Sequence, residues 1–221
     1  MERVKFGLLG AGGFAREVMP FVKGSVAKTL LIPESYIDTY FVETWQPKQL
    51  VVNGYSVLSL DEFIQISGKK YFNVAVGSGG DREAMVTKVG FSAEPLTLLA
   101  PQATILDCNI VGTGSVLCPN TMVTSNAKIG KFFQCNIYAY VAHDCIIGDF
   151  VTFAPGVRCN GRVHIDDYAY IGTNAIIREG TSEKPLRIGK GAVIGMGAVV
   201  IKDVPAGATV VGNPARLMEK R

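Results

Sequence analysis

Between Ile105 and Ile177 an aliphatic or small apolar residue returns at every sixth position. An amphipathic helix would repeat about every 3.6 residues and a lone strand every second residue, so a period of six fits neither. It is typical of a parallel β-helix, in which three six-residue faces make one 18-residue coil and each face points one side chain inward. The inward positions are Ile105, Val111, Leu117, Val123, Ile129, Cys135, Val141, Ile147, Phe153, Cys159, Ile165, Ile171 and Ile177.

Polar residues and glycines punctuate this repeat. Asn or Asp recurs near the expected corners, where tight turns tolerate a positive φ. After Ile177 the repeat resumes only at Ile188, so residues 178–187 are expected to form an extra surface loop. A solenoid of this kind can also serve as a passive rod, but the segment that precedes the repeat resembles a ligand site.

The N-terminal segment reads as the opening of a βαβ unit. A buried strand over residues 4–9 is followed by the turn Gly10-Ala11-Gly12-Gly13 and a helix over residues 14–22. Gly10, Gly12 and Gly13 would let the backbone approach a phosphate at the helix N-terminus. The spacing is not the full dinucleotide fingerprint, so a single nucleotide is favoured over a dinucleotide, and a turn that only connects is the alternative.

Two further strands extend this prediction. The second is expected to end at Asp38, where a carboxylate would meet a ribose or base. The third, over residues 72–76, leads into another glycine-rich turn, whose Gly77 and Arg82 are further candidates for binding the substrate. The sequence therefore predicts a Rossmann-like parallel α/β domain over residues 1–97 and a β-helix domain with a C-terminal cap over residues 98–221.

Composition excludes several classes of function. The 221 residues carry a net charge of +3 with dispersed Lys and Arg, which does not favour nucleic-acid binding. No apolar run approaches the roughly 20 residues of a membrane span, so membrane insertion is not expected. The five cysteines lack CxxC spacing, and Cys135 and Cys159 occupy inward positions. This pattern indicates a reducing cytoplasm without disulfides or a metal site.

The chain has two histidines, and His143 is the stronger candidate for chemistry. It lies two residues after the inward Val141, near a corner, where an imidazole can act as a general base. Asp144 beside it could hold the ring tautomer, although His-Asp pairs are also common at turns. One 18-residue coil further on is Gly161, whose amide could donate to the oxyanion of a thioester. His164 is expected to point outward from a strand face.

Four stretches of the chain carry a resemblance to a known family: residues 10–13, 142–149, 192–200, and 202–205 followed by 211–215. Together they resemble the sialic-acid-O-acetyltransferase-type sugar acyltransferases. This family belongs to the left-handed β-helix (hexapeptide repeat) superfamily and includes bacillosamine and perosamine N-acetyltransferases. The C-terminal pattern is common to the superfamily, whereas the N-terminal glycine turn joined to the His143 segment narrows the resemblance to this family.

The resemblance implies an acetyl-CoA-dependent N-acetyltransferase of bacterial surface-glycan biosynthesis. It would be a homotrimer that acetylates the amino group of a nucleotide-linked sugar by direct attack. His143 would be the general base, Asp144 its support, and Gly161 the residue facing the thioester. The nucleotide would be bound by the first glycine turn and Asp38. The acetyl-CoA contacts would come from Gly161, Gly195, Ala198, Asn213, Pro214 and Arg216.

The acceptor remains open at this stage. Phe14 stands where many relatives have His, Thr39 follows Asp38 where several have a second acid, and the segment 39–54 with the only Trp is long. An O-acetyltransferase of a sugar such as a sialic acid is therefore one alternative. A trimer that binds a nucleotide sugar without catalysis is the other.

Overall fold

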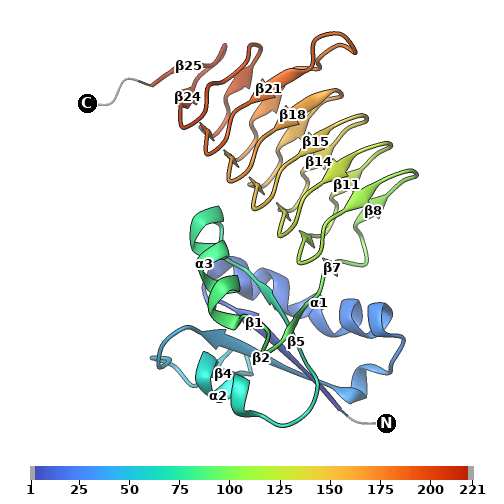
Figure 1. The fold of residues 1–221 in the computed structure, drawn as a ribbon, viewed down its shortest axis with the longest axis vertical. Helices are drawn as coiled ribbons and strands as arrows, with labels where there is room; N and C mark the ends of the chain where they lie inside the picture. Colours follow the sequence, from blue (N-terminus) through green and yellow to red (C-terminus); the bar gives the residue numbers. More distant parts are fainter. Residues whose placement is uncertain (1–2, 219–221) are drawn as a thin grey trace. The chain divides into compact units, whose positions relative to one another are not determined.

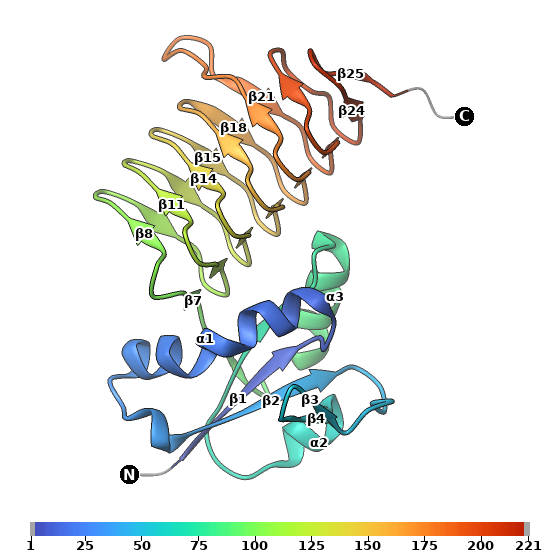
Figure 2. The ribbon, with the colours of Figure 1, turned by 180° about the vertical axis from the view of Figure 1, so that it is seen from behind.

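The computed structural model describes residues 3–218, which form two compact units (Figures 1 and 2). The division falls between Pro101 and Gln102, slightly later than the expected boundary at 97/98. Residues 219–221 of the expected C-terminal cap lie outside the described residues. Within the described chain, no helix has both the length and the apolar character of a membrane span.

Unit 1 is a six-stranded sheet with helices packed on it. The strand order is β3-β4-β2-β1-β5-β6, with β3 antiparallel to β4 and the other neighbours parallel. The elements are β1 (Val4–Leu9), α1 (Gly13–Leu30), the 3₁₀ turn η1 (Glu34–Tyr36), β2 (Ile37–Glu43), β3 (Val51–Val52), β4 (Tyr55–Ser59), α2 (Leu60–Gln65), β5 (Lys70–Val74), α3 (Gly79–Val89), β6 (Glu94–Pro95) and β7 (Leu98–Leu99).

The centre of unit 1 is closely packed around β1. Helices α1 and α2 lie on opposite sides of the sheet (Figures 1 and 2). A Cβ on Gly7 would lie 2.8 Å from Cζ of Phe63 and 2.9 Å from Cγ2 of Val42, so the ring of α2 sits directly on the strand. Helix α1 is longer than the expected 14–22, because buried residues continue at helical spacing as far as Val26.

Asp38 does not lie where the sequence predicted. It stands at the start of β2, opposite Lys5 of β1, whereas Gly10 follows the other end of β1. Since the two strands are parallel, Asp38 and the glycine turn lie at opposite edges of the sheet. The Asp38 carboxylate accepts hydrogen bonds from Arg3 and from Lys5 Nζ, the latter at 2.6 Å. Its predicted role in binding the nucleotide is therefore wrong.

Unit 2 is a solenoid of short strands that build three parallel sheets. The first contains β8 (Thr104–Ile105), β11 (Met122–Val123), β14 (Tyr140–Val141), β17 (Arg158–Cys159), β20 (Ile176–Ile177) and β23 (Val199–Val200). The second contains β9 (Ile110–Val111), β12 (Lys128–Ile129), β15 (Ile146–Ile147), β18 (Val163–Ile165) and β21 (Leu186–Ile188). The third contains β10 (Val116–Leu117), β13 (Gln134–Cys135), β16 (Thr152–Phe153), β19 (Tyr170–Ile171), β22 (Val193–Ile194) and β24 (Thr209–Val211), with β25 (Arg216–Leu217) antiparallel to β24.

Successive coils pair with a fixed offset of 18 residues. Val123 is opposite Val141, and Val141 is opposite Cys159. The predicted inward positions from Leu117 to Ile177 are all buried, whereas Ile105, in the first coil, is 36% exposed. The loop ends at residue 185, earlier than the expected 178–187, because the buried Leu186 already belongs to β21. Across the loop the offset is 23, as in the pair Ile165 and Ile188, so the insertion adds five residues.

A residue in the left-handed region marks the corners at six-residue intervals. Asn120, Asn126, Asp144 and Asn174 have φ between 55° and 60°, as the recurrence of Asn and Asp predicted. Bulky residues occupy others, which the sequence did not indicate. At one corner the rings of Phe132, Phe150 and Tyr168 stack with centroid separations of 5.3 and 5.6 Å, so contact between coils offsets the local backbone strain.

The ion pairs of Asp38 predict a pH-dependent contribution to the stability of unit 1. The hydrogen bond from Arg3, together with that from Lys5, lowers the pKa of Asp38 well below its ordinary value. Its stabilising effect is present above the ordinary pKa of about 4 and is lost as the pH falls toward the lowered value. Asp38→Asn should therefore reduce the unfolding free energy at pH 7 by about 1 kcal/mol, and by less below about pH 4.

Circular dichroism at 222 nm during urea unfolding measures this effect, because the α-helices of the described residues all lie in unit 1. Glu17→Gln, an exposed acid of α1 without an ion pair in the described chain, is the control and should change little at either pH. A loss that is the same at pH 3 and pH 7 would contradict the role of Asp38.

Candidate active site

His143 and Asp144 form a corner directly after β14. The inward Val141 anchors this corner in the core, and Asp144 adopts a left-handed conformation with φ of 59°. Backbone hydrogen bonds hold the turn on both sides: Asp144 N–H donates to Ser125 at 3.1 Å, and the His143 carbonyl accepts from Arg162 N–H at 2.9 Å. The corner is therefore fixed by the coils before and after it.

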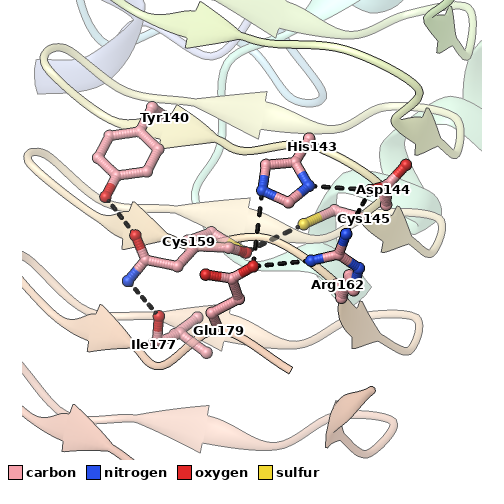
Figure 3. Close-up of polar contacts among 9 residues, drawn as sticks. Tyr140, His143, Asp144, Cys145, Cys159, Arg162, Ile177 and Glu179 are labelled. Carbon is pink, nitrogen blue, oxygen red and sulfur yellow. Dashed lines mark hydrogen bonds and ion pairs between the residues drawn. The ribbon is translucent and has the colours of Figure 1, made fainter. Parts of the chain in front are cut away.

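The two side chains are joined by a hydrogen bond. His143 Nδ1 lies 2.9 Å from Asp144 Oδ2 (Figure 3). This hydrogen bond lowers the pKa of Asp144, so the carboxylate is ionised near neutral pH. An ionised carboxylate only accepts, so Nδ1 carries the proton and Nε2 of a neutral ring has a free lone pair. The sequence predicted this partnership, and the geometry suits a general base at Nε2.

Gly161 lies against the imidazole, as the 18-residue spacing predicted. A Cβ at this position would lie 2.6 Å from His143 Nε2, so any side chain would displace the ring. Among residues 3–218 nothing accepts a hydrogen bond from the Gly161 amide. The position therefore lets the imidazole pack against the Gly161 backbone, whose N–H remains available as a donor.

Two side chains of this site were not identified from the sequence. Glu179 Oε1 lies 3.6 Å from His143 Nε2 and accepts a hydrogen bond from Arg162 Nη1 at 2.8 Å (Figure 3). Arg162 Nη2 also lies 3.7 Å from Asp144 Oδ2. Glu179 is 18 residues after Gly161 and 36 after His143, so the coil arithmetic continued by one more turn would have found it.

The extra loop contributes to a cavity next to this cluster. The cavity has a volume of about 350 Å³. Asp144, Arg162 and His164 line it from the solenoid, and Thr181, Ser182 and Pro185 line it from the loop. His164, which was expected to point outward, is half-buried, and burial lowers its pKa. The loop is thus part of the wall beside the candidate base.

The neighbouring cysteines belong to the core. Cys135 and Cys159 are fully buried, as their inward positions predicted. Cys145 Sγ lies 4.0 Å from Cys159 Sγ, and all five thiols are free. Burial raises the pKa of the Cys135 thiol well above its ordinary value, so that thiol packs as a small apolar group. In the described chain no three His, Cys, Asp or Glu side chains form a metal-binding group.

The glycine turns of unit 1 leave room for a ligand. Gly10 has φ of +99°, and a Cβ there would lie 3.2 Å from the carbonyl of Ala75. A Cβ on Gly12, Gly13 or Gly77 would meet no atom within 4 Å. Helix α1 begins after Gly12 without a side-chain cap, so its first N–H groups can bind an anion.

A cavity of about 480 Å³ lies beside the first glycine turn. Ala11 of the turn and Glu43 at the end of β2 both line it, together with Trp45. Glu43 therefore occupies the position that was predicted for Asp38. Trp45 is 75% exposed, and Lys88 Nζ lies 4.6 Å from its ring centroid. Glu43 could have been identified as the acid beside the glycine turn only from the register of β2 against β1, which the sequence alone does not determine.

Arg82 requires a second correction. The sequence suggested that it binds substrate, but its side chain is fully buried and donates to the Val76 carbonyl at 2.7 Å. Burial lowers its pKa to about 9. Arg82 therefore supports the second glycine turn from within the unit.

Only part of the predicted acetyl-CoA contact set lies together. A cavity of about 600 Å³ is lined by Arg216 and Lys202, two cations suited to a phosphate. Gly195, Asn213 and Pro214 do not line this cavity, although Asn213 and Pro214 are exposed. Ala198 is fully buried. Its N–H donates to the Gly195 carbonyl, and its own carbonyl accepts from Ile176 N–H. The prediction that Ala198 contacts the cofactor is therefore wrong.

Comparison with known proteins places this geometry in a family. No family model matches the chain. The chain is 43% identical over 217 residues to GDP-perosamine N-acetyltransferase of Escherichia coli O157:H7, which covers 97% of the chain and 96% of that protein. The structure of WeeI from Acinetobacter baumannii AYE is similar with a TM-score of 0.90 at 48% identity, covering 97% of this chain and 100% of that one.

A third similar structure contains bound acetyl coenzyme A. The acetyltransferase domain of PglB from Neisseria gonorrhoeae FA1090, in complex with acetyl coenzyme A, superposes with a TM-score of 0.83 at 28% identity, covering 99% of this chain and 100% of that one. The similarity to these proteins extends over nearly the whole chain, as the resemblance predicted. The chain belongs to the hexapeptide-repeat sugar acetyltransferases, the family of GDP-perosamine N-acetyltransferase, and is an acetyl-CoA-dependent N-acetyltransferase of a nucleotide-linked amino sugar.

Proposed function

We propose that the protein transfers the acetyl group of acetyl-CoA to the amino group of GDP-perosamine or a closely related GDP-linked amino sugar. The observation that carries the proposal is the His143–Asp144 pair beneath Gly161, in a chain 43% identical to GDP-perosamine N-acetyltransferase. The similarity to that enzyme supports the guanosine nucleotide, and the site supports the reaction.

The reaction needs one base and one oxyanion donor. The amine nitrogen attacks the thioester carbon, the C–N bond forms, and the carbonyl electron pair moves to oxygen, where the Gly161 N–H stabilises it. His143 Nε2 takes the surplus proton from nitrogen, and Asp144 stabilises the resulting imidazolium. When the carbonyl reforms, the C–S bond breaks and the thiolate receives this proton from His143. The products are the acetamido sugar and CoA thiol.

The remaining parts of the chain have binding roles in this proposal. The turn with Gly10, Gly12 and Gly13 binds the nucleotide diphosphate, with Gly77 beside it and Glu43 toward the ribose or base. Arg216 and Lys202 bind a phosphate of acetyl-CoA. Gly195, Asn213 and Pro214 contact the rest of the cofactor.

The architecture and assembly follow the same proposal. Unit 1 is a Rossmann-like domain and unit 2 a left-handed β-helix. The enzyme acts as a homotrimer in the cytoplasm, where acetyl-CoA is made and where free buried thiols persist.

His143→Ala should lower kcat at least 100-fold, because the surplus proton then has no positioned acceptor. CoA release from acetyl-CoA measures the reaction with GDP-perosamine and with a panel of UDP-, dTDP- and CMP-linked amino and hydroxy sugars. Thermal melting of the variant checks that the fold persists. Turnover of a hydroxy sugar alone would indicate an O-acetyltransferase, and tight binding without CoA release would indicate a non-catalytic protein.

Gly161→Ala should lower kcat at least tenfold with little change in melting temperature. The added methyl group displaces the His143 ring, which is 43% exposed and can move toward solvent. In a His143→Ala background the same change should have little further effect, because no ring is left to displace. A further loss of kcat in the His143→Ala background would indicate damage to the oxyanion donor. A wild-type kcat in Gly161→Ala alone would contradict the predicted displacement of the His143 ring.

A further inference from the structure

We propose that Glu179 recognises the positively charged amino group of the acceptor and thereby selects an amine over a hydroxyl. This inference rests on the proposed function and adds the residue that sets its acceptor class. Glu179 is the second residue of the extra loop, and its side chain is 50% exposed, so a substrate can reach it.

The position of Glu179 follows from the missing side chain at Gly161. His143, Gly161 and Glu179 occupy equivalent places in three successive coils, and Gly180 N–H donates to the Gly161 carbonyl at 3.0 Å. Because Gly161 has no side chain between them, Glu179 Oε1 comes within 3.6 Å of His143 Nε2. The carboxylate therefore faces the nitrogen that takes the proton.

A neutral His143 presents a lone pair to this carboxylate, since Nδ1 holds the ring proton toward Asp144. Glu179 Oε1 already accepts from Arg162 Nη1 but keeps a further lone pair, so a donor bound beside both atoms can serve Oε1 and Nε2. An ammonium has three N–H donors and a positive charge, so it can donate to Oε1 and Nε2 together. A hydroxyl has one donor and no charge, so it can satisfy only one of them.

The charges of the cluster support the same ligand. Asp144 and Glu179 contribute two negative charges, Arg162 contributes one positive charge, and neutral His143 contributes none. The sum of −1 is balanced by one ammonium. Arg162 holds Glu179 in place through the hydrogen bond at 2.8 Å, so the carboxylate is oriented before the substrate arrives.

The proton balance stays complete in this arrangement. The bound ammonium releases one proton to water and becomes the neutral amine that attacks the thioester. One of its remaining N–H groups still donates to Glu179, which orients the nitrogen lone pair. The second proton leaves through His143 to the CoA thiolate during acetyl transfer. No oxidant or further reactant is needed.

The test compares two ligands on the full-length protein. Isothermal titration calorimetry without acetyl-CoA measures the affinity for GDP-perosamine and for the GDP-sugar with a hydroxyl in place of the amino group. The wild type should bind the amino sugar about tenfold more tightly at pH 7, a difference of about 1.4 kcal/mol. Glu179→Gln keeps the size and an acceptor for Arg162, and it should abolish this preference by weakening only the amino sugar.

Glu183→Gln is the matched control. It removes the same charge from the same loop, where Glu183 accepts from Ser182, and should leave the preference unchanged. Between pH 7 and 9 the wild-type preference should fall as the ammonium deprotonates, whereas that of Glu179→Gln should stay flat. Equal weakening of both ligands, or an unchanged preference, in Glu179→Gln would overturn the role of Glu179.

The two proposals fail in different ways. If the wild type releases no CoA with any amino sugar, the proposed function is wrong. If it releases CoA normally and Glu179→Gln keeps both the preference and its pH dependence, only the role of Glu179 is wrong. Should another nucleotide sugar be the substrate, the same amino and hydroxy pair of that nucleotide gives the comparison.

Discussion

The backbone hydrogen bonds between successive coils are the interaction on which the rest of unit 2 depends. Lys128 N–H donates to the Cys145 carbonyl at 2.9 Å, and Gly148 N–H donates to the Ile165 carbonyl at 2.7 Å. Such hydrogen bonds hold each coil on the next. Each coil alone is too short to bury a core, so stability comes from the stacking itself. The same bonds turn a spacing of 18 along the chain into direct contact in space.

That contact explains how a few residues form the candidate active site on a regular scaffold. The backbone of its corner holds His143 in place, and a hydrogen bond to Asp144 orients the ring. Gly161 in the next coil has no side chain, so it does not displace the ring. Glu179 reaches the ring from one coil further. Each residue needs only the right identity at its position, because the scaffold supplies the geometry. The proposed base is therefore positioned with little specialised backbone.

The period of six made the solenoid and the corner with His143 predictable, because its geometry is local and repeats. Unit 1 was less predictable in detail. The start of β2 depends on pairing with β1, and a shift of a few residues moved Asp38 to the opposite edge of the sheet and placed Glu43 beside the glycine turn. Arg82 and Ala198 were misassigned because burial depends on contacts distant in the sequence. Glu179 was missed because it lies in the segment that interrupts the repeat.

The five-residue insertion after Ile177 separates the requirements of folding from those of substrate selection. The six-residue repeat resumes at Ile188, and the loop packs on the solenoid through Gly180 and the buried Leu186, so its other, exposed positions lie outside the core. Yet the loop carries Glu179 and walls the cavity beside Asp144. Changes at the exposed positions of the loop can therefore alter which acceptor is bound with little effect on the core. Such a scaffold is well suited to diversification, because related enzymes can acquire new sugar preferences while the coil that carries the base remains the same.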